Sequence, residues 1–175
     1  MIKTIVFDVG GVLVKRDVFA TIILGLSQQY NLDPISLRTT ASALWEEVSA
    51  GKITEKEFWP KLLNSFQLPI NLLAEIETQE INLMNPVDPV WGYVNQLHGN
   101  YKLAILSNMG ERWAKIREEK FKLSKYFNPI IWSYDIKLSK PDIKIFSYLA
   151  EKIDNLPAEC VFIDDKEENI AAGRQ

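Results

Sequence analysis

Residues 5–13 read IVFDVGGVL, an apolar run that reaches Asp8 and continues through two glycines. A short, almost unbroken apolar run is typical of a parallel β-strand that is covered on both faces. Asp8 therefore stands where a buried strand would end, and a glycine, Gly10, occupies the position two residues later. The other predicted strands indicate which role a single carboxylate at this position has.

Three other apolar runs predict further strands, at residues 103–106, 161–163 and, more weakly, 130–132. Helical patterns separate them, and strands that alternate with helices are typical of βαβ units. The sequence therefore predicts an α/β fold with a doubly wound parallel sheet. We expect the strand order 130–132, 103–106, 2–7, 161–163.

The stretch between the first two strands shows helix signals and no convincing strand. Phe19, Ile22 and Leu26 share one helical face. Thr54 and Glu57 have the spacing of a capping box ahead of another apolar face. We therefore predict a small helical insert at residues 16–85, and an α/β core formed by residues 1–15 and 86–175.

Composition excludes several classes of protein. The 175 residues are 47% apolar with a net charge of −3 and one cysteine, Cys160. This pattern shows no nucleic-acid footprint, no polybasic membrane patch and no disulfide framework. The start of the chain lacks the pattern of a signal peptide, and no apolar run approaches the ~20 residues that span a bilayer. We expect a cytoplasmic protein with a small-molecule partner, and the oligomeric state stays open.

Polar residues follow each predicted strand. In an open parallel sheet, ligands bind beyond the carboxyl ends of the strands. The residues expected at that edge are Asp8, Ser107, Asn108, Lys140, Asp164 and Asp165. An acid, a hydroxyl, a cation and two further acids suit phosphoryl transfer to a carboxylate in the presence of Mg²⁺.

The acids have alternative interpretations. Asp8 is either a nucleophile or an acid that caps a turn at the strand end. Asp164 and Asp165 repel each other unless a cation such as Mg²⁺ offsets them, although one of them would also suit the N-cap of the next helix. Asn169, one helical turn past Asp165, either holds that carboxylate or lies on the surface.

The other strand-end residues have alternatives too. Ser107 and Asn108 suit a phosphate group at a helix N-terminus, or they form an ordinary N-cap. Lys140 either neutralises phosphoryl charge or is a surface lysine.

Four segments, FDVGGVL, LAILSN, KLSKPDIKIF and VFIDD, resemble the ordered motifs of the haloacid dehalogenase-like hydrolase superfamily. The resemblance covers residues 1–14 and 87–175, and residues 16–85 resemble the superfamily's helical cap. The opening segment is similar to that of sugar-phosphate phosphatases.

The resemblance implies a role for each matching residue. Asp8 would be the nucleophile and a metal ligand, and Gly10 would offer its backbone carbonyl to the metal. Lys140 would hold both Asp8 and the phosphate. The rest of the implied set is Ser107 for the transferring phosphoryl group, Asn108 near the substrate, and Asp164 and Asp165 as further contacts of Mg²⁺.

Gly10 departs from the pattern, because many phosphatases of the superfamily carry an aspartate there that protonates the leaving group. Loss of such a group costs roughly 10²–10⁴ in rate. Three explanations compete: a good leaving group or ordered water suffices, a cap-side acid such as Asp17 substitutes, or the protein is a poor phosphatase.

The end of the sequence is a second departure. The family usually has a further strand and helix where this sequence stops, ten residues past Asp165. The resemblance therefore implies a truncated C-terminus and an exposed edge on the strand at 161–163, with reduced stability or association as the consequence.

We predict a Mg²⁺-dependent phosphatase that hydrolyses a small phosphorylated metabolite, with a sugar phosphate as one candidate, through an aspartyl phosphate on Asp8. Two alternatives stay open. One is a 2-haloacid dehalogenase-type hydrolase, against which the acid pair Asp164 and Asp165 argues. The other is a catalytically weak phosphometabolite-binding protein.

Overall fold

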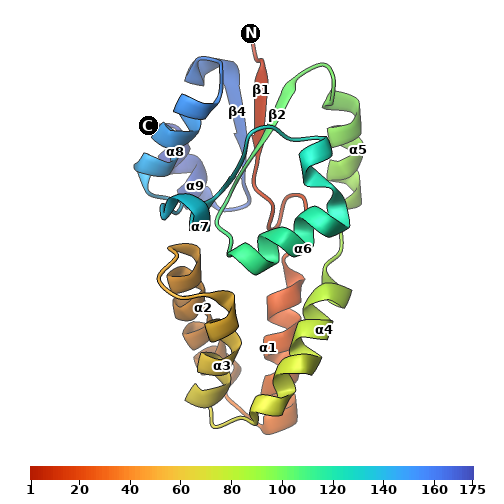
Figure 1. Cartoon of the computed structure of the whole chain (residues 1–175), viewed down its shortest axis with the longest axis vertical. Coiled ribbons are helices and arrows are strands. Elements are labelled where there is room, and N and C mark those ends of the chain that lie inside the picture. The colour runs from red at the N-terminus through yellow and green to blue at the C-terminus, as the bar shows by residue number, and fades with distance from the viewer.

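The structure is a computed structural model that describes residues 1–175, apart from the side chain of Asp17. The strands are β1 (Thr4–Phe7), β2 (Lys102–Ser107), β3 (Ile130–Trp132) and β4 (Cys160–Ile163). The helices are α1 (Asp17–Tyr30), α2 (Pro34–Ser49), α3 (Glu55–Ser65), α4 (Leu73–Leu83), α5 (Asp88–Leu97), α6 (Glu111–Phe121), α7 (Ser133–Ile136), α8 (Ile143–Lys152) and α9 (Glu167–Gly173). Figure 1 shows the sheet in one part of the molecule and helices α1–α4 in the other, beyond the ends of the strands.

The four strands form one parallel sheet in the order β3-β2-β1-β4, which confirms the predicted order. In the register of this sheet, Phe7 lies opposite both Ile105 and Ile163. The carboxyl ends of β1, β2 and β4 therefore meet at one edge, and this edge faces α1–α4 (Figure 1).

Alternation along the strands fills a core on each face of the sheet, because successive side chains point to opposite faces. Ile5, Phe7, Leu103 and Ile105 belong to the larger core, together with buried residues of α5 and α6. Val6, Ala104, Leu106 and Ile131 belong to a second core with residues of α8, of which Ile145 is fully buried.

The prediction that every strand is covered on both faces is wrong for one side of β4. Val161 and Ile163 keep 39% and 36% of their surface exposed. They lie opposite Ile5 and Phe7, so they face the same side of the sheet. The residues that bury Ile5 and Phe7 on this side of the sheet therefore do not fully cover β4.

Helices α1–α4 occupy the chain between β1 and α5, where the sequence predicted only helices. The Thr54 N–H donates to Glu57 Oε2 over 2.9 Å, which confirms the predicted capping contact at the start of α3. Two backbone hydrogen bonds join the connections into and out of this segment, from Lys15 to Asn85 and from Val87 to Leu13. The boundaries predicted at residues 15 and 86 fall at these paired connections, and the division into two domains stays a prediction.

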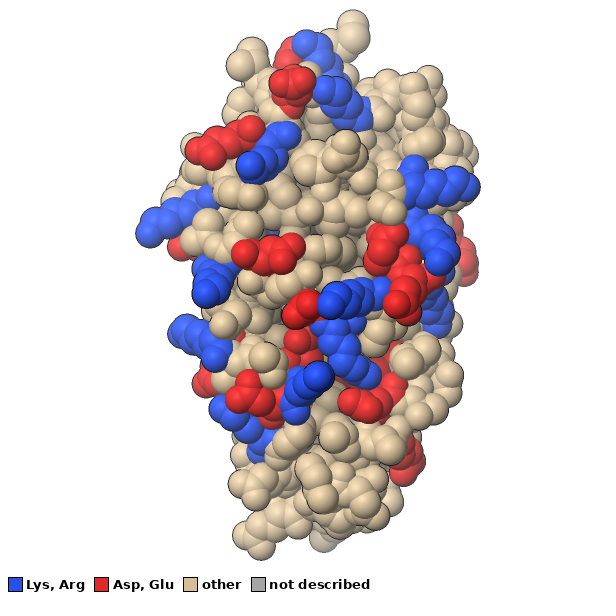
Figure 2. All heavy atoms as spheres, in the orientation of Figure 1, with Lys and Arg blue, Asp and Glu red and all other residues tan. Residues whose placement is uncertain are grey.

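Charged side chains of both signs are interspersed on the face shown in Figure 2. No single-sign patch dominates that face. Among the described residues, no helix has the length and apolar character needed to cross a membrane.

Candidate active site

The turn after β1 places the first carboxylate of the site. The Asp8 N–H donates to Ile163 O over 2.8 Å and so continues the β1–β4 pairing by one residue. The chain then reverses, with the N–H groups of Leu13 and Val14 both donating to Val9 O. Asp8 is only 7% exposed, so this residue is buried just beyond the carboxyl end of β1.

Lys140 joins the first and last acids of the predicted set. Its Nζ lies 3.1 Å from Asp8 Oδ1 and donates to Asp164 Oδ2. The lysine side chain is 1% exposed, so the interpretation of Lys140 as a surface residue is wrong. The structure thus brings together Asp8, Lys140 and Asp164, although Lys140 follows Asp8 by 132 residues and Asp164 follows Lys140 by 24 residues along the sequence.

Asp164 is held by several donors. Lys166 N–H donates to Oδ1 over 2.9 Å, and Asn169 Nδ2 donates to both carboxylate oxygens over 2.9 and 3.0 Å. Burial by itself would raise the pKa of Asp164, but Lys140 and these donors bring it below its usual range. Asn169 is 3% exposed. The expectation that it holds Asp165 is wrong, because its amide reaches the neighbouring acid instead.

Asp165 has a different environment. Burial raises its pKa, and the charges of Asp8 and Asp164 raise it further, while Arg16 opposes them. Arg16 Nη2 donates to Asp165 Oδ1 over 2.6 Å. Burial is the main cause of the raised pKa of Asp165 and repulsion from the other two carboxylates adds to it, so positive charge at this edge would stabilise the charged form of Asp165.

The two residues after β2 take separate positions. Ser107 ends β2, opposite Trp132, and is 1% exposed. The Asn108 side chain donates to Lys140 O and accepts from Lys140 N, each over 2.8 Å. The N-cap of α6 is Gly110, so the interpretation of Ser107 and Asn108 as that N-cap is wrong. Asn108 instead fixes the backbone of the lysine that contacts Asp8.

The donor set suits a divalent cation. One oxygen from each of Asp8, Asp164 and Asp165 lies within 4.8 Å of the other two. Mg²⁺ prefers carboxylate and carbonyl oxygens, and a bound cation would offset the burial and the neighbouring negative charges that raise the pKa of Asp165. Gly10, whose carbonyl is the fourth ligand implied by the family resemblance, follows Asp8 by two residues.

Two contributors to this site were not predicted. Arg16 carries no motif signal, because a lone arginine in a linker has no spacing that links it to Asp165. Gly11 was visible as half of a glycine pair, but only the structure shows that its φ of +83° and its closeness to Asp165 require a glycine. The proposed substitute acid, Asp17, lies outside the described side chains.

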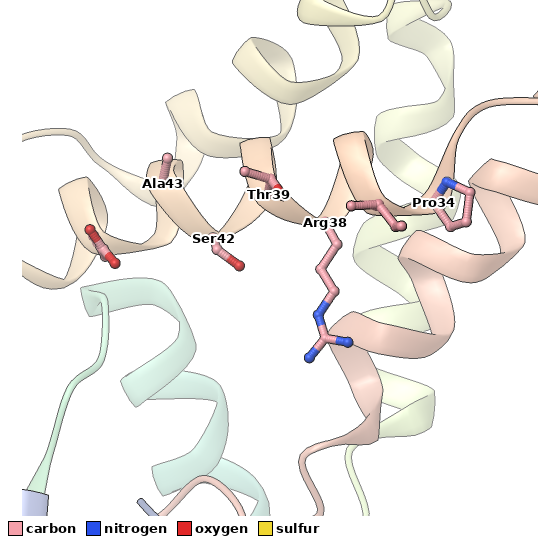
Figure 3. A pocket seen from close by; sticks show the side chains of 7 residues that line it. Pro34, Arg38, Thr39, Ser42 and Ala43 are labelled. Atoms are coloured by element: carbon pink, nitrogen blue, oxygen red, sulfur yellow. The ribbon is translucent and has the colours of Figure 1, made fainter. Parts of the chain in front are cut away.

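A separate hollow lies over α2. It is lined by Pro34, Ile35, Arg38, Thr39, Ser42, Ala43 and Glu46 (Figure 3). None of these residues belongs to the strand-end site.

The whole chain matches one protein family. Residues 2–175 match the model of the haloacid dehalogenase-like hydrolases. The chain belongs to this family. It is an enzyme family, so the predicted superfamily and enzyme class are confirmed.

Two curated relatives of this haloacid dehalogenase-like hydrolase are phosphatases. A D-ribitol-5-phosphate phosphatase of Bacteroides thetaiotaomicron is 29% identical over 100% of this chain and 88% of its own length. The sesquiterpene phosphatase astK of Aspergillus oryzae is 25% identical over 98% of this chain and 85% of its own. These names favour the phosphatase interpretation over the dehalogenase alternative.

Solved structures share the fold. One is a haloacid dehalogenase family enzyme of Bacteroides thetaiotaomicron, solved as an Asp-to-Ala mutant in complex with magnesium and inorganic phosphate. It superposes with a TM-score of 0.80 at 22% sequence identity, and the match covers 99% of this chain and 90% of that chain. An L-2-haloacid dehalogenase of Xanthobacter autotrophicus gives 0.71 at 20% identity, over 99% and 74%. At these identities the likeness shows the fold alone, which serves both chemistries.

Proposed function

We propose that this protein is a Mg²⁺-dependent phosphomonoester hydrolase that acts on a small phosphorylated metabolite through an aspartyl phosphate on Asp8. One observation carries the proposal. A buried Asp8 contacts Lys140 at the carboxyl edge of the sheet, within 4.8 Å of two further carboxylates. The phosphatase relatives support it, and the ribitol phosphate named for one of them makes a polyol or sugar phosphate our first candidate.

The proposed reaction has two displacements at phosphorus. In the first, an Asp8 oxygen attacks the phosphoryl group, the bond from phosphorus to the ester oxygen breaks, and the leaving oxygen takes a proton from solvent water. In the second, water attacks the acyl phosphate, which releases inorganic phosphate and restores the carboxylate.

The residues around Asp8 have supporting roles in this scheme. Lys140 orients the Asp8 carboxylate and neutralises charge on the phosphoryl oxygens, and Ser107 binds one of these oxygens. Asp8, the Gly10 carbonyl, Asp164 and Asp165 would hold Mg²⁺, which when bound supplies positive charge to the phosphoryl group. We further propose that residues 16–85 form a cap that selects the substrate. We also propose a cytoplasmic location, because the single cysteine, Cys160, is free.

The decisive experiment compares the wild type with Asp8→Asn on a panel of aryl, polyol and sugar phosphates, with and without Mg²⁺. We expect turnover that needs Mg²⁺ and is abolished by Asp8→Asn, with a folded variant by circular dichroism. Asp154→Asn is the matched control, because the Asp154 side chain is 95% exposed. Absence of turnover over the whole panel would contradict a phosphatase, and halide release without metal would favour the dehalogenase alternative.

A further inference from the structure

Helix α6 lies between the sheet and the α1–α4 unit, which we define as residues 17–83 (Figure 1). Its first residue, Glu111, comes four positions after Ser107, so any shift of its N-terminus moves the segment 107–110. A contact that fixes the start of α6 therefore also fixes the predicted phosphate-binding residues.

One residue of α6 is held by two acids of the α1–α4 unit. The backbone N–H of Trp113 donates to Glu55 Oε1 over 3.3 Å, and its indole N–H donates to Glu80 Oε1 over 2.7 Å. Glu55 is 8% exposed and Glu80 is 1% exposed, so both carboxylates are buried at the junction. A buried carboxylate is costly unless donors satisfy it, so these contacts are required by the packing.

Glu55 fills a gap left by the sequence of α6. The N-cap residue of this helix is Gly110, which has no side chain to accept a hydrogen bond from the first turn. A Cβ on Gly110 would lie 2.3 Å from Glu55 Oε1, so the carboxylate occupies the space of the missing side chain. The α1–α4 unit thus supplies the hydrogen-bond acceptor that caps α6, a helix that follows strand β2 of the sheet.

Further contacts converge on the same residue. The Trp113 ring stacks on the Trp45 ring, with the ring centroids 4.9 Å apart. It meets the rings of Phe19 and Phe58 edge-on, at centroid distances of 5.3 and 5.5 Å. Arg112 Nη1 donates to Glu80 Oε2 over 2.7 Å. Trp113 is therefore the point at which α6 is attached most extensively to the α1–α4 unit.

We propose that Trp113 is a positioning residue, through which the α1–α4 unit sets the geometry of segment 107–110. The proposal rests on the phosphatase function proposed above. When Glu55 and Glu80 accept hydrogen bonds from Trp113, the N-terminus of α6 is fixed and Ser107 is held in the position in which it binds a phosphoryl oxygen. When they release it, the segment loosens and phosphate binding weakens.

The chain offers a matched pair of variants. Trp59 donates its indole N–H to the same Glu80 oxygen over 2.9 Å and, like Trp113, is 1% exposed. Trp59 lies in α3, within the α1–α4 unit, so its bond does not connect that unit to α6. Trp113→Phe and Trp59→Phe each remove one indole bond to Glu80, but only Trp113→Phe cuts an attachment of α6.

We expect the two variants to lower the melting temperature by similar amounts and to differ in three other measurements. Trp113→Phe should weaken binding of inorganic phosphate, measured by calorimetry with Mg²⁺, about 10-fold. It should reduce kcat for aryl and alkyl phosphates alike, and it should speed hydrogen exchange of the amides of residues 107–114. Trp59→Phe should stay within 2-fold of the wild type in all three. Equal effects of the two variants, at equal loss of stability, would overturn the proposal.

A second test separates capping from positioning. In the double variant E55A/G110S, the new serine supplies a local N-cap in the space that Glu55 vacates. We expect it to restore stability relative to Glu55→Ala but not kcat, because the contact between Glu55 of the α1–α4 unit and Trp113 is still missing. Full recovery of kcat would show that capping alone is needed. Hydrogen exchange needs no substrate, so it tests the attachment even if the phosphatase proposal fails.

Discussion

Gly11 and Asp165 lie so close together that a Cβ on Gly11 would come within 2.1 Å of Asp165 Oδ2. Gly11 also has a φ of +83°, in the left-handed region that other residues avoid. Gly11, the second glycine after Asp8, therefore leaves room for the Asp165 carboxylate, which lies just beyond β4. A side chain at position 11 would clash with this carboxylate, so the turn requires a glycine there.

The first prediction concerns this contact. Gly11→Ala should displace the Asp165 carboxylate, and we expect Mg²⁺ affinity and kcat to fall at least 10-fold, measured by calorimetry and steady-state kinetics. Gly10→Ala is the control, because a Cβ there meets no atom within 4 Å and the backbone carbonyl stays in place. Equal losses in the two variants would refute the steric argument.

The open space at Gly10 allows a test of the missing acid. Gly10→Asp should speed hydrolysis of alkyl phosphates, whose leaving groups need a proton, by up to roughly 10²-fold, the lower end of the effect of a general acid. Aryl phosphates should gain much less. Gly10→Asn is the matched control without an acid, and a gain of equal size with it would exclude proton donation as the cause.

Asn108 should matter through the backbone of Lys140. Asn108→Ala removes two hydrogen bonds, each worth about 0.5–1.5 kcal/mol, so we expect the free energy of unfolding to fall by about 1–3 kcal/mol. Because Lys140 then loses its fixed position, kcat should fall about 10-fold or more. The control is Asn95→Ala, which removes one exposed bond to Trp91 O and should leave kcat unchanged.

A pH dependence follows from the capping contact at α3. Hydrogen bonds from the Thr54 N–H and hydroxyl hold the pKa of Glu57 below its ordinary value of 4.5. A lowered pKa in the folded state adds stability above the unfolded value, and this contribution disappears as the pH falls through the folded pKa. Glu57→Gln should therefore be less stable than the wild type at pH 7.

Urea unfolding at pH 7, 5 and 3.5 provides the measurement. We expect the difference in unfolding free energy between Glu57→Gln and the wild type to be about the same at pH 7 and pH 5, and to be smaller at pH 3.5, below the ordinary pKa of 4.5. A difference that is independent of pH would show that the Glu57 charge does not contribute.

The sequence determined the strands of the sheet, because buried parallel strands leave almost unbroken apolar runs and polar residues follow their ends, and the predicted order was confirmed. It also indicated Asp8, Lys140, Asp164 and Asp165 as candidates, since residues that follow parallel strands must meet at that edge. The exposure of Val161 and Ile163 could not be read from their apolar character. A run of apolar residues does not record whether a helix covers it.

Only the tertiary structure decided which side chains touch. It paired Asn169 with Asp164, Arg16 with Asp165, and Asn108 with the backbone of Lys140. It also placed Glu55 and Glu80 on Trp113, over 58 and 33 residues of sequence. Local spacing fixes helices and strands because their hydrogen bonds are local, whereas contacts between distant residues depend on how the elements pack.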